Sequence, residues 1–183
     1  MRVFLAIEFP ENIKEYLNQV QLVVKGQSVK GNFTKKENYH LTLHFIGQIR
    51  NDELDYLKEV IDEAAGKQNC FQMTLNQLGH FTRGNKQIVW VGILPNEILN
   101  KLYIQLAMLL KCKGYTIEER KFVPHITIGR EVVLTKEFNK MEQQMKLNEV
   151  VIPVSKISLM ESTRIKGELK YIPLYTKEFR CSR

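Results

Sequence analysis

Two short motifs in this sequence carry side chains that could perform acid–base chemistry. His40 and Thr42 are two residues apart, and His125 and Thr127 repeat that spacing in the second half of the chain. The residues around both pairs alternate between polar and apolar, which predicts β-strands with each histidine and its threonine on one face. Two facing imidazoles could supply an acid and a base, while the hydroxyls stabilise a developing charge. This set of groups suits cleavage of a phosphodiester without a metal ion.

The same residues also allow less specific interpretations. Each motif could be an amphipathic strand whose histidine and threonine face solvent, although the matching pair favours a shared site. Strict alternation places His44 on the face of His40, either in the site or at its rim. It places Arg130 on the face opposite His125, unless a bulge at Gly129 turns it into the cleft. A metal site built from the histidines is a weaker alternative, because no carboxylate or cysteine stands at ligand spacing.

Composition sets limits on the class of protein. A chain of 183 residues that is 44% hydrophobic and 26% charged can form one domain, or two small lobes that share a core. The net charge of +7 favours a polyanionic partner such as nucleic acid, although a basic solvated surface would give the same charge. A non-catalytic RNA-binding module is therefore the main alternative to an enzyme.

The cysteines and apolar stretches indicate where the protein works. Cys70, Cys112 and Cys181 are far apart and form no C-x-x-C pair, so we expect reduced cysteines, no zinc ribbon and a cytoplasmic protein. We also expect a monomer. The apolar run at 3–7 is interrupted by Glu8, which predicts a strand and not a signal peptide. We expect no membrane span, because no apolar stretch approaches the required length of about 18 residues.

The periodicity of apolar residues predicts an α+β fold. Strands are expected at 3–8, 39–48, 71–75, 88–93, 121–129, 151–159 and 171–179, and helices at 10–24, 51–66, 95–114 and 136–145. Turns at 83–86 and 166–168 should close two hairpins, and the polar segment 26–38 reads as a loop. Phe33 in that segment would be a core plug or, less favoured, a platform for a base.

The order of these elements is repeated. A motif strand, a helix, a strand, a turn and a strand occur twice, which indicates an internal duplication with a period of about 85 residues. We therefore expect two pseudo-symmetric lobes that face each other, with the two motifs where the lobes meet. The chain has no linker rich in proline, glycine or serine, so residues 1–183 should form a single domain.

Both motifs resemble a known family. The segments HLTLHF (40–45) and PHITIGR (124–130) are similar to the twin H-x-T signatures of the 2H phosphoesterases. The most similar branch is the RNA 2′,3′-cyclic phosphodiesterases, also called 2′-5′ RNA ligases. The opening RVFLAI (2–7), a Gly-x-Phe turn at 79–81 and the segment ISLMES (157–162) resemble that branch as well. One departure is Phe33, which stands where many members carry tryptophan.

The resemblance implies a fold, a function and roles for residues. The implied fold has two antiparallel sheets with outer helices around a central cleft. The implied reaction is hydrolysis of an RNA-terminal 2′,3′-cyclic phosphate to a 2′-phosphate, with 2′-5′ ligation as its reverse and without metal or cofactor. The substrate would be a tRNA fragment or an oligonucleotide. By analogy His40 is the proton donor and His125 the proton acceptor, with Thr42 and Thr127 as hydroxyl donors. The expected substrate-binding residues are Arg130, Phe81, Phe33 and His44.

Overall fold

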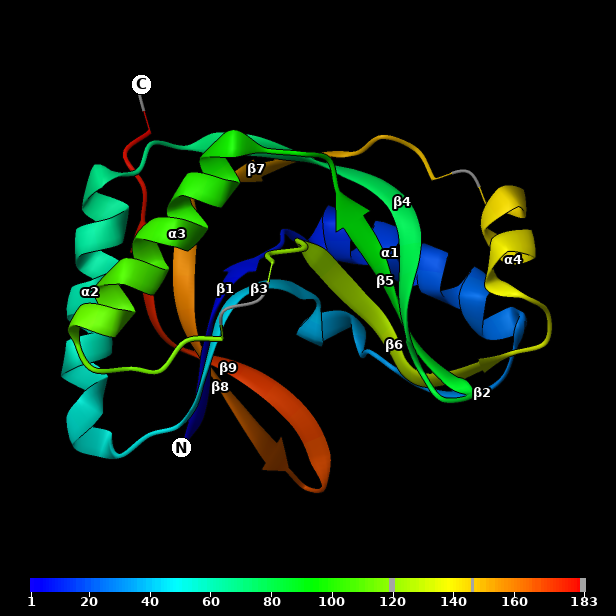
Figure 1. The fold of residues 1–183 in the computed structure, drawn as a ribbon, viewed down its shortest axis with the longest axis horizontal. Coiled ribbons are helices and arrows are strands. Elements are labelled where there is room, and N and C mark those ends of the chain that lie inside the picture. Colours follow the sequence, from blue (N-terminus) through cyan, green and yellow to red (C-terminus); the bar gives the residue numbers. More distant parts are fainter. Residues whose placement is uncertain (119–120, 146, 182–183) are drawn as a thin grey trace.

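The computed structural model describes residues 1–118, 121–145 and 147–181, which form two antiparallel sheets with flanking helices (Figure 1). The four-stranded sheet has the order β3-β1-β8-β9, with bounds β3 (His40–Gln48), β1 (Arg2–Glu8), β8 (Lys156–Ile165) and β9 (Glu168–Glu178). The five-stranded sheet has the order β2-β6-β5-β4-β7, with bounds β2 (Ser28–Phe33), β6 (His125–Leu134), β5 (Lys86–Ile93), β4 (Phe71–Arg83) and β7 (Val151–Val154). The predicted α+β fold class is confirmed.

Two helices pack against each sheet. The helices are α1 (Glu11–Gly26), α2 (Leu54–Lys67), α3 (Glu97–Cys112) and α4 (Phe138–Gln144). Helices α2 and α3 contact each other and the four-stranded sheet, whereas α1 and α4 contact the five-stranded sheet (Figure 1). Helix α3 begins where the sequence predicts, because the side chain of Asn96 accepts a 2.9 Å hydrogen bond from the amide of Leu99. None of the helices in the described ranges is long and apolar enough to cross a membrane.

The repeat is present, but the two halves of the chain do not form separate lobes. Motif strand β3 lies in the four-stranded sheet, whereas the hairpin β4–β5 that follows it joins the five-stranded sheet. Motif strand β6 lies in the five-stranded sheet, and its following hairpin β8–β9 joins the four-stranded sheet. Each sheet is therefore completed by the other half of the chain. One hydrophobic cluster includes buried residues of both sheets, such as Leu41 and Ile126.

The segment predicted as a loop contains regular structure. Residues Ser28–Phe33 form β2, which pairs with β6, and Lys36–Asn38 form a short 3-10 helix. Strand β2 is at the edge of its sheet and its side chains are exposed or half-buried. An exposed edge strand does not need alternating apolar residues, so the polar sequence of β2 gives no pattern typical of a strand.

Several predicted boundaries are wrong. The strand expected at 151–159 is divided between β7 and β8, which lie in different sheets. The second motif strand begins at His125 and not near 121. Asn51 starts a 3-10 helix that precedes α2, and α2 continues through Gly66. Gly79, for which the sequence predicts a turn, lies within β4.

The prediction of reduced cysteines is also contradicted. Cys70 and Cys181 are joined by a disulfide across 111 residues of sequence, whereas Cys112 is free and exposed. The amide of Cys70 donates to the carbonyl oxygen of Arg180 at 3.0 Å, so the C-terminal segment lies beside the start of β4. This tertiary contact cannot be read from the spacing of the cysteines.

Candidate active site

The two motif strands meet at one small cleft. Strand β3 supplies His40 and Thr42, strand β6 supplies His125 and Thr127, and the four residues line a cavity of about 60 Å³. The cavity is also lined by Thr34, Arg130 and Tyr171. The structure thus brings together the four motif residues that the sequence singles out. It adds Thr34 and Tyr171, for which the sequence predicts no role in the site.

Both motif histidines are oriented by the same backbone contact. Nδ1 of His40 lies 2.7 Å from the carbonyl oxygen of Asn38, and Nδ1 of His125 lies 2.7 Å from that of Val123. A carbonyl oxygen can only accept, so each Nδ1 carries the proton and donates it. In the neutral rings Nε2 is then the unprotonated nitrogen. In both strands the oxygen belongs to the residue two positions before the histidine.

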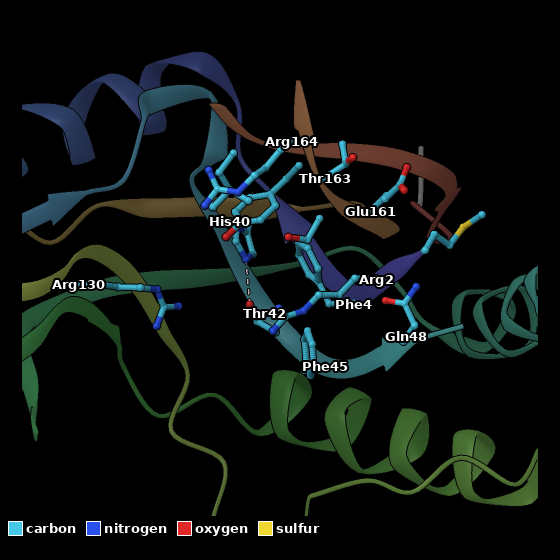
Figure 2. A pocket seen from close by; sticks show the side chains of 14 residues that line it. Arg2, Phe4, His40, Thr42, Phe45, Gln48, Arg130, Glu161, Thr163 and Arg164 are labelled. Carbon is cyan, nitrogen blue, oxygen red and sulfur yellow. Dashed lines mark hydrogen bonds between the residues drawn. The ribbon is translucent and has the colours of Figure 1, made fainter. Parts of the chain in front are cut away.

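The two Nε2 atoms differ in their partners. Nε2 of His40 lies 2.9 Å from the hydroxyl oxygen of Thr42, which donates to it while the ring is neutral (Figure 2). Within the described ranges, no protein hydrogen bond ends on Nε2 of His125, so its lone pair is open to a ligand. The hydroxyl of Thr34 donates to the carbonyl oxygen of Thr127 at 2.9 Å and ties this part of the site to β2.

Aromatic rings enclose His40. Its ring centroid is 4.8 Å from that of Phe4 and 4.9 Å from that of Tyr171, which meets it edge-on. Phe4 belongs to a small hydrophobic cluster, separate from the main core, against which Tyr171 packs. The pKa of His40 is lowered to about 4, mainly by burial. The hydrogen bond to Asn38 opposes this shift, and the charge of Arg130 contributes to it.

His125 has a similar aromatic setting on the other sheet. Its ring lies 5.2 Å from Phe81, again edge-on, and 5.7 Å from Trp90. Burial is the main cause that lowers the pKa of His125, and the charge of Arg130 adds to it. A Cβ atom at Gly79 would lie 2.0 Å from the Trp90 ring, so only glycine lets the indole cross β4 at this point. Phe81 thus lies beside His125, and its role in binding substrate stays a prediction. Trp90 is a neighbour that the sequence does not reveal.

A bulge in each motif strand changes which residues face the cleft. On β3, Thr42 pairs with Ala6 and His44 with Leu5, which leaves Leu43 without a partner on β1. On β6, Thr127 pairs with Trp90 and Gly129 with Val89, which leaves Ile128 without a partner on β5. Each extra residue reverses the alternation of side chains beyond it. The prediction for His44, which assumes strict alternation, is therefore wrong about its face, whereas Arg130 follows the alternative in which a bulge turns it into the cleft.

His44 turns towards the interior and away from His40. It is 3% exposed, its Nε2 donates to the carbonyl oxygen of Tyr103 at 2.8 Å, and its ring stacks on that of Tyr103 at 4.1 Å. The next residue, Phe45, takes the outward position and is 49% exposed. His44 thus positions a neighbouring aromatic ring, and Phe45 reaches the surface where the sequence predicts His44.

Arg130 turns into the cleft, as Figure 2 shows, and extends from β6 towards Thr42. The bulge requires a small residue beside it, because a Cβ atom at Gly129 would lie 2.9 Å from Val132 and 3.1 Å from Phe33. Phe33 packs over this glycine and against the main core. Its predicted role as a platform for a base is therefore not supported by its position, whereas a structural role is.

A larger groove of about 800 Å³ continues from the cleft on the side of His40 (Figure 2). Arg2, Arg130 and Arg164 line it, together with Glu161 and the ring of Phe45. The guanidinium of Arg2 lies 4.8 Å from the centre of that ring, which is a cation–π contact. The groove is polar and mainly cationic, so an anionic chain fits it better than an apolar ligand.

In the part of the chain that the structure describes, no group of three or more His, Cys, Asp or Glu side chains is placed to hold a metal ion. The histidines considered for such a site are separated, because His44 lies on the opposite face of β3 from His40. The cleft is lined by two imidazoles, one guanidinium and four hydroxyl-bearing residues, Thr34, Thr42, Thr127 and Tyr171.

Comparison with known proteins gives the family. The family model described as the 2′-5′ RNA ligase superfamily matches residues 9–166. The RNA 2′,3′-cyclic phosphodiesterase of Thermotoga maritima is 28% identical over 98% of this chain and 96% of its own. The protein with the same name from Methanocaldococcus jannaschii is 34% identical over 71% of each chain.

Solved structures share the fold. A crystal structure of E. coli LigT complexed with 3′-AMP superposes with a TM-score of 0.80, at 24% identity and over 97% of both chains. The structure of TT0787 of Thermus thermophilus superposes with a TM-score of 0.78, at 20% identity and over the whole of both chains. Together with the match to the family model, these similarities show that the chain belongs to the 2′-5′ RNA ligase superfamily of 2H phosphoesterases.

Proposed function

We propose that this protein hydrolyses the 2′,3′-cyclic phosphate at the end of an RNA chain to a 2′-phosphate, without a metal ion. The observation that carries the proposal is the single cleft of about 60 Å³ lined by His40, Thr42, His125 and Thr127. The relatives from T. maritima and M. jannaschii are named for this activity and support it. We also propose that residues 1–183 act as one cytoplasmic, monomeric domain.

The geometry supports a mechanism with two roles. Nε2 of His125 takes a proton from water as its oxygen bonds to phosphorus, since Nδ1 is already held as a donor by Val123. The bond from phosphorus to the 3′-oxygen breaks, and Nε2 of His40 protonates that leaving oxygen. The hydroxyls of both threonines and the guanidinium of Arg130 stabilise the charge on the non-bridging oxygens.

Substrate binding favours the protonated form of His40, which its role as the acid requires. The low pKa of His40, about 4, leaves its ring neutral in the free protein at neutral pH. A phosphate anion within the cleft favours the imidazolium, so substrate binding raises this pKa. Thr42 then ceases to donate to Nε2 and is free to turn its hydroxyl towards the phosphate.

The substrate chain has a natural place beside the acid. The 3′-oxygen that leaves towards His40 belongs to the terminal ribose, so that ribose and the preceding RNA lie on the same side. The cationic groove with Arg2 and Arg164 opens there (Figure 2). Tyr171 lines both the cleft and the groove and would contact the terminal nucleoside. A tRNA fragment or an oligonucleotide with a cyclic phosphate end fits this arrangement.

The test is product analysis on an oligonucleotide that ends in a 2′,3′-cyclic phosphate, with EDTA present. We expect a 2′-phosphate as the product, and a loss of at least about 100-fold in rate for both His40→Ala and His125→Ala. Binding of the oligonucleotide without any product would instead support the non-catalytic RNA-binding module. In the reverse direction, the same groups would join a 5′-hydroxyl RNA to form a 2′-5′ linkage.

A further inference from the structure

A second pocket, of about 520 Å³, adjoins the cleft on the side of His125. His125 lines it and His40 does not, whereas the cationic groove contains His40 and not His125. Thr42 and Phe45 line both cavities and so lie between them. The reacting phosphate would therefore have a separate cavity on each side, each adjoining a different histidine.

Flat aromatic rings form much of this second pocket. The rings of His44 and Tyr103 stack at 4.1 Å, and those of Tyr103 and Phe122 stack at 3.9 Å with only 8° between their planes. Phe81, which is 37% exposed, lines the same pocket and touches His125 edge-on. His44 is buried and the ring of Tyr103 is stacked against both His44 and Phe122, so the rings left to meet a ligand are the half-buried Phe122 and the exposed Phe81. An accessible aromatic ring beside cationic residues is a usual platform for an unpaired nucleobase. The volume is within the range of pockets for a molecule the size of a nucleoside.

The direction of attack identifies the occupant. In an in-line displacement at phosphorus, the attacking oxygen and the leaving oxygen lie on opposite sides. The leaving 3′-oxygen is on the side of His40, so the attacking oxygen approaches from the side of His125. We infer that the pocket beside His125 binds the nucleoside whose 5′-hydroxyl attacks the cyclic phosphate in place of water. This inference rests on the proposed function and adds a site for the second RNA.

The step balances without a further reactant. The 5′-oxygen forms a bond to phosphorus and passes its proton to Nε2 of His125. The bond from phosphorus to the 3′-oxygen breaks, and that oxygen takes the proton of His40. The product is a 2′-5′ phosphodiester beside a free 3′-hydroxyl. Exchange of one proton with water returns both histidines to their starting states.

The rim of the pocket indicates where the second RNA continues. Arg83 is exposed and lines this pocket together with an adjoining cavity of about 250 Å³. Lys86 lines that adjoining cavity and forms a 3.1 Å ion pair with Glu131. We place the first phosphate after the attacking nucleoside at Arg83. A 5′-hydroxyl dinucleotide would then use Arg83, whereas a single nucleoside would not.

The experiment measures how the cyclic phosphate is shared between water and a 5′-hydroxyl acceptor. The donor is an oligonucleotide with a 2′,3′-cyclic phosphate end. The acceptor is either adenosine or the 3′–5′-linked dinucleotide ApA with a free 5′-hydroxyl. The readout is the ratio of 2′-5′ joined product to 2′-phosphate. We expect Phe122→Ala to lower this ratio about tenfold with both acceptors, the effect of one lost stacking contact. Arg83 is exposed, and we expect Arg83→Ala to lower this ratio only with the dinucleotide acceptor.

Tyr56→Ala is the matched control, because Tyr56 is an exposed aromatic residue of α2 that lines neither cavity. Its ratio should equal that of the wild type. An unchanged ratio in Phe122→Ala would overturn the inference. So would slower hydrolysis with an unchanged ratio, since the pocket would then hold the donor nucleoside. Absence of joined product from an enzyme that still hydrolyses the donor also overturns it, whereas loss of both products refutes the proposed function itself.

Discussion

Leu43 and Ile128 occupy equivalent places in the two motif strands. Each follows a motif histidine by three residues, and each lacks a partner on the neighbouring strand β1 or β5. The residues two positions further along, Phe45 and Arg130, therefore both turn outwards and line the cavities around the cleft. The pseudo-symmetry extends to the backbone irregularities, while the side chains at the equivalent positions differ. One half presents an aromatic ring and the other a cation.

The position of Arg130 predicts a change in histidine titration. Its positive charge lowers the pKa of both His40 and His125. Arg130→Gln should therefore raise both values, and Arg130→Lys should leave them closer to the wild type. NMR titration of the histidine ring protons measures these shifts directly. Arg50→Gln is the control, since Arg50 pairs with Asp52 on the surface.

The same arginine should matter for turnover. Loss of a cation that stabilises phosphate oxygens typically costs about 100-fold or more in rate. We expect Arg130→Gln to lower kcat for the cyclic phosphate substantially, with Arg130→Lys retaining more of it. Unchanged titration curves together with unchanged kcat would show that Arg130 does not act in the cleft.

Gly79 offers a test of the wall behind His125. The added methyl group of Gly79→Ala would lie 2.0 Å from the Trp90 ring, so the indole must move. Trp90 is the only tryptophan of the chain, and its ring lies against His125 and Phe81. We expect a changed tryptophan emission spectrum, a destabilisation of about 1–3 kcal/mol and reduced hydrolysis.

Gly66→Ala is the matched control for that substitution. Gly66 lies in helix α2, and a Cβ atom there would meet no other atom within 4 Å. Alanine in a helix is about 0.5–1 kcal/mol more favourable than glycine, so this variant should be slightly more stable. Its emission spectrum should match the wild type. Identical spectra for both variants would mean that the indole does not depend on Gly79.

Local patterns predicted the elements better than their connections. Apolar periodicity located helices α1 to α4 and both motif strands, because each buries one regular face. It missed the bulges at Leu43 and Ile128, since a bulge is a relation to a neighbouring strand and leaves no mark in its own sequence. Strict alternation therefore misplaces His44, whereas Arg130 enters the cleft by the alternative that a bulge near Gly129 provides.

The long-range features were hidden for a related reason. The exchange of hairpins between the two sheets and the bond between Cys70 and Cys181 depend on segments that are distant in the chain. The repeat can be recognised in the sequence, but the sequence pattern does not indicate which sheet each hairpin joins. Phe33 is ambiguous in the sequence, and the structure shows that its ring covers Gly129.

The exchange of hairpins predicts cooperative unfolding. Neither sheet is complete without strands from the other half of the chain, so the two sheets should unfold together. We expect one urea transition, with coincident midpoints for Trp90 emission, which reports on the five-stranded sheet, and for amide exchange in β1 of the four-stranded sheet. Two separated midpoints would show that the two sheets unfold independently and would contradict the single-domain proposal.

The half-buried ring of His40 predicts how stability depends on pH. Its pKa is about 4 in the folded protein and 6.5 in the reference state, so between these values the unfolded chain binds more protons. Stability is therefore fully present above pH 6.5 and is lost as the pH falls towards 4. From pH 7 to pH 5 the loss from this group is up to about 2 kcal/mol. Urea titrations should show this extra loss in the wild type and not in His40→Asn, while Ile104→Ala, an exposed change on α3, should keep the wild-type dependence. An equal slope in all three proteins would mean that His40 titrates normally in the fold, and the substrate would then not be needed to charge the acid.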